Sequence, residues 1–203
     1  PISLDGKIDE AGWTDAPPFD LIMQSPNYGE PPSEKTEILV GFDAQFLYIG
    51  ASLFDNKPDK IQNPSKKRDY MQGDTGWFGV ILDTFNDKEN GLVFYTTPSG
   101  LRFDGAIFND AVPSSPESMP INISWNTFWD VETMTDDRGW FAEIRIPFSR
   151  LRFQENDGIV IMGLILYRFI PRKNEVNIYP SIPPNWGPYS SWKCSRACDV
   201  SLE

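Results

Sequence analysis

The hydrophobic residues of this chain occur in short runs separated by polar turns, a pattern typical of β-strands. The run 77–82 is too short and too rich in aromatic and β-branched residues to favour a helix, so we expect a strand that is buried on both faces. The polar segment 86–91 then predicts a turn. Residues 92–97 should return antiparallel to the first strand, and residues 101–108 should add a third. We expect this meander to form the centre of the fold.

Further strands are predicted on both sides of the meander, and the sequence contains no long amphipathic helix and no repeat. The expected strands cover residues 36–42, 46–54, 128–134, 140–146 and 159–169. Near the amino terminus we expect a turn at Asp5-Gly6, a helical turn capped by Asp9, and Trp13 plugging one end of the core. Many short strands with turn signals between them predict an all-β fold, an antiparallel β-sandwich.

The chain has 203 residues, a length that commonly folds as one all-β domain. We therefore expect one domain over residues 1–203, of which about 180–203 form a tail rich in proline and aromatic residues that leads into a downstream region. The longest mainly apolar run, residues 158–167, is about half the length that a membrane-spanning helix needs. No membrane insertion of this domain is expected.

Charge and composition exclude several classes of function. The net charge of −11 argues against binding to nucleic acid or to an anionic membrane surface, because both need a basic face. The chain has no histidine, which excludes histidine-based catalytic triads and histidine-containing zinc sites. Cys194 and Cys198 could close a small disulfide loop in an exported protein, or they could be two unpaired thiols.

Several motifs follow one another along nearly the whole chain: Leu4-Asp5-Gly6 with Trp13, residues 29–37, residues 46–50, Arg68-Asp69, residues 82–87, Pro98-Ser99-Gly100, Trp125 with Trp129, Gly139-Trp140 with Glu143, residues 146–149, Leu151-Arg152-Phe153, and Arg172 with Glu175. In this order they resemble the motifs of family 9 carbohydrate-binding modules, particularly the amino-terminal domain that precedes an outer-membrane β-barrel in many Gram-negative proteins. This resemblance implies a sandwich with jelly-roll character. It also implies an exported protein of the periplasm or cell surface, associated with the outer membrane through other regions.

The resemblance implies a sugar ligand held between two aromatic rings, and the positions that correspond are Tyr70 and Tyr179. Such rings suit the task because the C–H face of a sugar packs on an aromatic face, and both tyrosines should be exposed. The chain departs from the family at Gly76, where an acidic residue is usual, and at Tyr95 and Thr97, which lie near polar or basic positions. The sugar site could therefore be altered or lost.

Other candidate residues follow from the segments in which they lie. Trp125 and Trp186 lie in segments rich in asparagine, serine and proline, where an exposed aromatic ring could bind sugar. Oxygen-rich loops suit calcium, which related modules carry as a structural ion. The candidate ligands are Asp69, Asp74, Asp104 and Asp110.

These observations favour a carbohydrate-binding module without catalytic activity, part of a larger envelope protein. The alternative is a docking domain that keeps the fold but binds its own downstream β-barrel or an envelope protein. A glycoside hydrolase needs only two carboxylates, and the 29 acidic residues leave such a pair open, although no motif singles one out.

Overall fold

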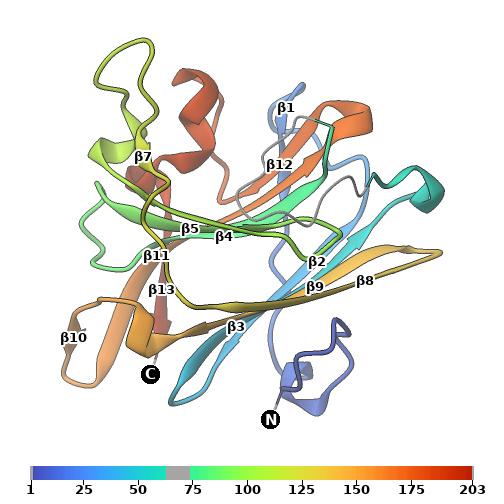
Figure 1. Ribbon diagram of the computed structural model, residues 1–203, viewed down its shortest axis with the longest axis horizontal. Helices are drawn as coiled ribbons and strands as arrows, with labels where there is room; N and C mark the ends of the chain where they lie inside the picture. Colours follow the sequence, from blue (N-terminus) through green and yellow to red (C-terminus); the bar gives the residue numbers. More distant parts are fainter. Residues whose placement is uncertain (1, 63–73, 203) are drawn as a thin grey trace.

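The structure, a computed structural model, describes residues 2–62 and 74–202 and contains two antiparallel β-sheets packed face to face (Figure 1). Alternate residues of each strand face the space between the sheets, which places the apolar positions of both sheets in one shared interior. The predicted antiparallel β-sandwich is therefore confirmed.

The large sheet has the strand order β1-β12-β11-β4-β5-β6-β7, and β10 and β13 also pair with β11. Its strands are β1 (Ile22–Ser25), β4 (Trp77–Asp83), β5 (Gly91–Thr96), β6 (Arg102–Ile107), β7 (Ile121–Asn122), β10 (Glu155–Asn156), β11 (Ile159–Ile170), β12 (Glu175–Tyr179) and β13 (Cys198–Leu202). The predicted meander corresponds to β4, β5 and β6 and lies inside this sheet.

The small sheet has the order β2-β3-β9-β8. Its strands are β2 (Thr36–Phe42), β3 (Phe46–Phe54), β8 (Asp130–Asp136) and β9 (Gly139–Pro147). The predicted bounds of β2 and β3 are confirmed, whereas β8 begins two residues later than expected.

The helical segments are all short 3-10 turns: η1 (Ala11–Trp13), η2 (Pro58–Lys60), η3 (Asn109–Ala111), η4 (Phe148–Arg150), η5 (Pro171–Lys173), η6 (Gly187–Trp192) and η7 (Cys194–Arg196). Within residues 2–62 and 74–202, no helix is long and apolar enough to cross a membrane. The N-cap of η1 is Glu10 rather than the predicted Asp9, and its side chain makes no capping hydrogen bond.

The interior between the sheets is filled by large apolar side chains. Trp129 is fully buried there and meets the ring of Phe94 edge-to-face, with ring centroids 5.5 Å apart. Phe78 from the large sheet and Ile49 from the small sheet are also fully buried in this cluster. Burial of each such side chain stabilises the fold by roughly 1.5–3 kcal/mol, so this interior is the main source of stability.

A second apolar cluster covers the outer face of the large sheet, and the carboxyl-terminal segment packs over it (Figure 1). Trp192 of η6 is buried and donates a hydrogen bond from Nε1 to the hydroxyl of Tyr95, 3.0 Å away. The segment after residue 180 then supplies β13, which pairs with residues 160–164 of β11. The predicted tail is thus an integral layer of the fold.

The amino-terminal segment covers the outer face of the small sheet. Trp13 is buried, and its indole carbons lie 3.1 Å from the position that a Cβ at Gly50 would take. Trp13 therefore packs across the outside of the small sheet, and the prediction that it plugs one end of the core is wrong. A glycine at position 50 is what allows this close approach.

Both cysteines are free, which decides between the two alternatives left by the sequence. Cys194 is fully buried in the outer cluster of the large sheet. Cys198 lies in β13, where its sulfur accepts a hydrogen bond from the hydroxyl of Tyr179 at 3.2 Å.

Candidate functional site

A cavity of about 340 Å³ opens at one end of the large sheet. It is lined by the end of β4, the start of β5, the end of β6, the segment that crosses from β7 to β8, and the residues that follow β9. The crossing segment passes from one sheet to the other in Figure 1. The lining residues are Thr84, Phe85, Asn90, Gly91, Leu92, Ala106, Ile107, Phe108, Asn122, Trp125, Arg150 and Arg152.

Three aromatic side chains contribute to this cavity. Trp125 is half-buried and meets the core ring of Phe94 edge-to-face at 6.1 Å, which fixes the indole on the cavity wall. Phe85 and Phe108 remain 43% and 39% exposed, which is unusual for side chains of this size in a well-packed sandwich. Exposed aromatic rings of this kind can stack on a ligand.

Local hydrogen bonds hold the crossing segment that carries Trp125. The backbone N–H of Trp125 donates to the carbonyl of Asn122 at 3.3 Å. Two residues further on, the N–H of Thr127 donates to the carboxylate of Asp104 at 2.9 Å. Asp104 is buried on β6, so this bond ties the segment to the large sheet and keeps Trp125 in place.

Arg150 and Arg152 flank Leu151, which is buried and has an extended backbone conformation. Leu151 packs into the core cluster, and the arginines on either side of it remain outside that cluster. Both arginines are exposed and both line the cavity. They add two cationic groups next to the amides of Asn90 and Asn122.

The lining residues suit binding rather than chemistry. Apolar rings, amides and guanidinium groups are the groups that recognise a polar ring-shaped molecule. The twelve lining residues include no aspartate, glutamate or cysteine, and therefore no side chain suited to act as a general base or nucleophile near neutral pH.

Tyr179, predicted as a sugar platform, lies at the end of β12 and is half-buried. Its ring meets Phe19 edge-to-face at 5.0 Å, and burial raises the pKa of its hydroxyl to about 12. The intended partner, Tyr70, lies outside the described residues. Tyr179 does not line the cavity that contains Trp125.

Trp186 precedes η6 and is 38% exposed. The guanidinium of Arg196 lies 4.9 Å from its ring centroid and the ammonium of Lys193 lies at 5.8 Å. The ring is thus engaged in cation–π contacts within its own segment, apart from the residues that line the Trp125 cavity.

The three candidate calcium ligands that the structure describes, Asp74, Asp104 and Asp110, do not form a group whose carboxylate oxygens could share a metal ion. Asp69 lies outside the described residues, and Asp74 borders a shallow hollow beside Arg172. Asp104 holds the crossing segment, as described above. Asp110 accepts hydrogen bonds from the backbone N–H and the hydroxyl of Ser195, at 2.9 and 2.7 Å, and so ties η3 to η7.

A different group of acids could hold a cation. Asp5, Glu10 and Glu143 each place a carboxylate oxygen within 4.8 Å of the others, and they form the one such group of three in the part of the chain that the structure describes. Glu143 is buried, accepts the N–H groups of Asp5 and Gly6 at 2.9 and 2.8 Å, and has a pKa raised by burial. Carboxylate oxygens at this spacing suit calcium.

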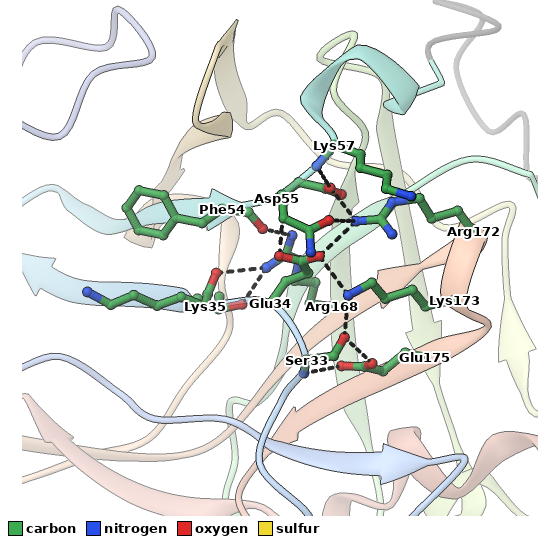
Figure 2. A network of polar contacts seen from close by, with 12 residues as sticks. Ser33, Glu34, Lys35, Phe54, Asp55, Lys57, Arg168, Arg172, Lys173 and Glu175 are labelled. Atoms are coloured by element: carbon green, nitrogen blue, oxygen red, sulfur yellow. Dashed lines mark hydrogen bonds and ion pairs between the residues drawn. The ribbon is translucent and has the colours of Figure 1, made fainter.

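A network of charged residues joins the two sheets at one end of the sandwich (Figure 2). The guanidinium of Arg168 is buried and donates to the carbonyls of Lys35 and Phe54 and to the hydroxyl of Thr36 at 2.6–3.0 Å. Burial lowers the pKa of Arg168 to about 10.

The remaining charges of this network pair with one another. Arg172 contacts Glu34 at 2.7 Å and also Asp55, while Lys173 contacts Glu34 at 2.6 Å. Glu175 accepts two hydrogen bonds from Ser33. Because its charges are matched, the network acts as a structural clamp between the two sheets.

Comparison with known proteins identifies the fold. No protein-family model and no curated protein sequence matches the chain. Among solved structures, a family 9 carbohydrate-binding module from Caldicellulosiruptor kristjanssonii in complex with cellotriose is similar, with a TM-score of 0.63, 15% identity, and coverage of 100% of this chain and 90% of that chain. The chain has the fold of family 9 carbohydrate-binding modules. A module of this family from the same organism in complex with glucose gives a TM-score of 0.61, 15% identity, and coverage of 100% and 92%.

Within this family 9 fold, sequence reasoning found one member of the cavity, Trp125, and missed the others. Phe85 and Arg152 belong to motifs that resemble the family, but nothing in those motifs shows that the two side chains line one cavity. Phe108 and Arg150 carry no local signal of a site. The available signal was indirect, since Arg150 and Arg152 flank an apolar residue in a segment that Pro147 takes out of the sheet.

Proposed function

We propose that this domain is a carbohydrate-binding module without catalytic activity, and that the cavity beside Trp125 holds the sugar. The observation that carries the proposal is the grouping of Trp125 with the exposed rings of Phe85 and Phe108 next to amide and guanidinium groups. Aromatic rings pack against the C–H face of a sugar, and the polar groups orient its hydroxyls.

The similar structures support the same function, because both contain a sugar, cellotriose in one and glucose in the other. The lining of the cavity supports the absence of catalysis. A glycosidase needs two carboxyl groups on either side of the bond that it cleaves, and the lining residues offer none.

The setting in the cell follows from the resemblance alone and forms part of the proposal. The module would be exported to the periplasm or cell surface and would act within a larger envelope protein, delivering bound sugar to a neighbouring domain. Fractionation of cells that make the full-length protein tests this, and recovery in the cytoplasmic fraction would contradict it.

The binding experiment is isothermal titration calorimetry with glycans selected by an array screen, on the wild type and on Trp125→Ala. We expect Trp125→Ala to weaken binding about five- to thirtyfold, since stacking of a sugar ring on an aromatic face contributes on the order of 1–2 kcal/mol. The matched control is Trp186→Ala, which removes an exposed tryptophan outside the cavity and should leave affinity unchanged. Equal loss in both variants, or no loss in Trp125→Ala, would rule out this cavity as the site.

A second function, docking to a protein partner, is favoured by the apolar surface of the segment around the crossing. Val112, Met119, Ile123 and Phe128 are 45–56% exposed, and exposed apolar residues gathered in one segment are typical of contact surfaces. If no glycan binds the wild type, the docking function gains support. The double variant Ile123→Ser/Phe128→Ser should then release the domain from the rest of the full-length protein. Faster limited proteolysis of the segment that joins the domain to the rest would detect the release.

A further inference from the structure

We propose that the Trp125 cavity selects an anionic sugar, one that carries a carboxylate or a sulfate ester, through Arg150 and Arg152. The inference rests on the proposed function and specifies its ligand class. The common chemistry of uronic acids and sulfated sugars is a planar or tetrahedral oxyanion on a sugar ring, and the guanidinium group binds both with paired hydrogen bonds.

The first argument is the charge of the cavity against the charge of the chain. The protein has a net charge of −11, with 29 acidic residues against 18 basic ones. The described residues that line the cavity nevertheless include two arginines and no carboxylate. Four other hollows of the described surface each include at least one acidic residue: Asp55, Asp74, Asp130 with Glu132, and Asp9 with Glu37. The cavity is therefore positively charged on a protein whose surface is otherwise mainly negative.

The second argument is that these two arginines have no partner within the described chain. Neither Arg150 nor Arg152 forms an ion pair with any described residue, although acids outnumber bases. By contrast, Arg138 pairs with Asp136 at 2.6 Å and Arg145 pairs with Asp130 at 2.6 Å. Both cavity arginines thus keep their donors available for a ligand.

The third argument is the backbone that presents the pair. Leu151 is buried in the core and separates Arg150, the last residue of η4, from Arg152, and both arginines line the same cavity. Two like charges that line one cavity repel each other, and a bound anion relieves that repulsion. Amide side chains would bind the hydroxyls of a neutral sugar equally well, so two arginines favour an anionic sugar.

The arrangement gives each part of the ligand its own contact. The sugar ring lies on Trp125 and the exposed rings of Phe85 and Phe108, while its anionic substituent lies at the two guanidinium groups. Asn90 and Asn122 remain for the neutral hydroxyls.

The test is titration calorimetry with three oligosaccharides of equal length: an oligogalacturonate, a chondroitin sulfate fragment and a neutral cello-oligosaccharide. They are titrated into the wild type, into the double variant Arg150→Gln/Arg152→Gln, and into Arg138→Gln as a matched control that removes one exposed arginine elsewhere. We expect at least one anionic ligand to bind the wild type ten or more times more tightly than the neutral one. The double variant should lose that preference and keep its affinity for the neutral ligand, and Arg138→Gln should behave as wild type.

The possible results separate the inference from the function on which it rests. Preference for the galacturonate or for the sulfated fragment identifies which oxyanion the arginines recognise. Binding of the neutral ligand that needs Trp125 and shows no anionic preference overturns the inference and leaves the carbohydrate-binding function standing. An anionic preference that survives in the double variant also overturns it. Failure of all glycans, charged and neutral, overturns both. The substituted arginines are exposed, so the variants should fold, and thermal unfolding checks that they do.

Discussion

Gly79, in the middle of β4, is the position at which one added methyl group should damage the fold most clearly. Its register partners on the two neighbouring strands are Tyr95 and Tyr167, whose rings stack on each other 5.0 Å apart with planes 10° from parallel. A Cβ at Gly79 would lie 2.2 Å from the carbonyl oxygen of Phe94 and 2.3 Å from Cδ1 of Tyr95. The glycine thus makes room for the tyrosine stack.

The loss of stability in Gly79→Ala depends on which neighbouring atoms can move away from the added methyl group. The nearest atom belongs to the backbone of β5, which is held between β4 and β6, so the strands must separate. Overpacking of this kind costs about 1–3 kcal/mol, and a disturbed aromatic pair adds about 0.5–1.5 kcal/mol. The lower entropy of alanine in the unfolded chain offsets about 0.4–1 kcal/mol. We therefore expect Gly79→Ala to lower the free energy of unfolding by about 2–3 kcal/mol, or the melting temperature by about 4–12 °C.

Urea unfolding followed by tryptophan fluorescence measures this loss directly. The matched control is Gly41→Ala in β2, where the nearest atom to the new Cβ is in the ring of Trp13, at an ordinary contact distance of 3.7 Å. That variant should stay within about 0.5 kcal/mol of the wild type. If Gly79→Ala is as stable as Gly41→Ala, the close packing of β4 against β5 is not what the structure shows and the reasoning fails.

Three further variants or measurements test other parts of the fold. Glu143→Ala should cost about 1–3 kcal/mol because the N–H groups of Asp5 and Gly6 lose their acceptor, whereas Glu143→Gln keeps an acceptor oxygen. Burial raises the pKa of Glu143, so the wild type should lose stability relative to Glu143→Gln as the pH rises above about 4.3, the usual pKa of a glutamate side chain. Chemical unfolding that shows the same pH dependence in both proteins would contradict this. Arg168→Met should cost about 3–5 kcal/mol, because the carbonyls of Lys35 and Phe54 and the hydroxyl of Thr36 lose their buried donor, whereas Lys35→Met at an exposed position should change the melting temperature little. Thiol labelling of the native protein at pH 8 should modify Cys198 and spare Cys194, whose pKa burial raises to about 12, and equal rates for the two would refute the buried position of Cys194.

The cavity could not be derived from the sequence because its parts come from distant points of the chain. Phe85 follows β4, Phe108 follows β6, Trp125 lies on the crossing to the small sheet, and Arg150 and Arg152 follow β9. Each residue is unremarkable in its own segment. Strand pairing brings them to one end of the large sheet, and no local pattern contains that pairing.

The strand β12 shows how burial can mislead a sequence pattern. Its residues Glu175 and Asn177 are buried and face the interior, where Arg168 and its neighbours provide a polar setting. When only polarity is considered, an acidic residue and an amide at these positions predict a loop and not a strand. The interior at this end of the sandwich is polar, so the usual relation between apolar character and burial is reversed there.

The sequence by itself determined the sandwich class and the strands of its centre, because period, turn residues and β-branched or aromatic content are local properties. β2 and β3 begin and end where the pattern predicts. The tertiary structure alone decided that Trp13 covers the outside of the small sheet, that residues 198–202 return to pair with β11, and that Arg150 and Arg152 line the same cavity as Trp125. Those outcomes depend on which surfaces remain uncovered once the sheets have packed, and packing between distant segments is not encoded in the periodicity of any one of them.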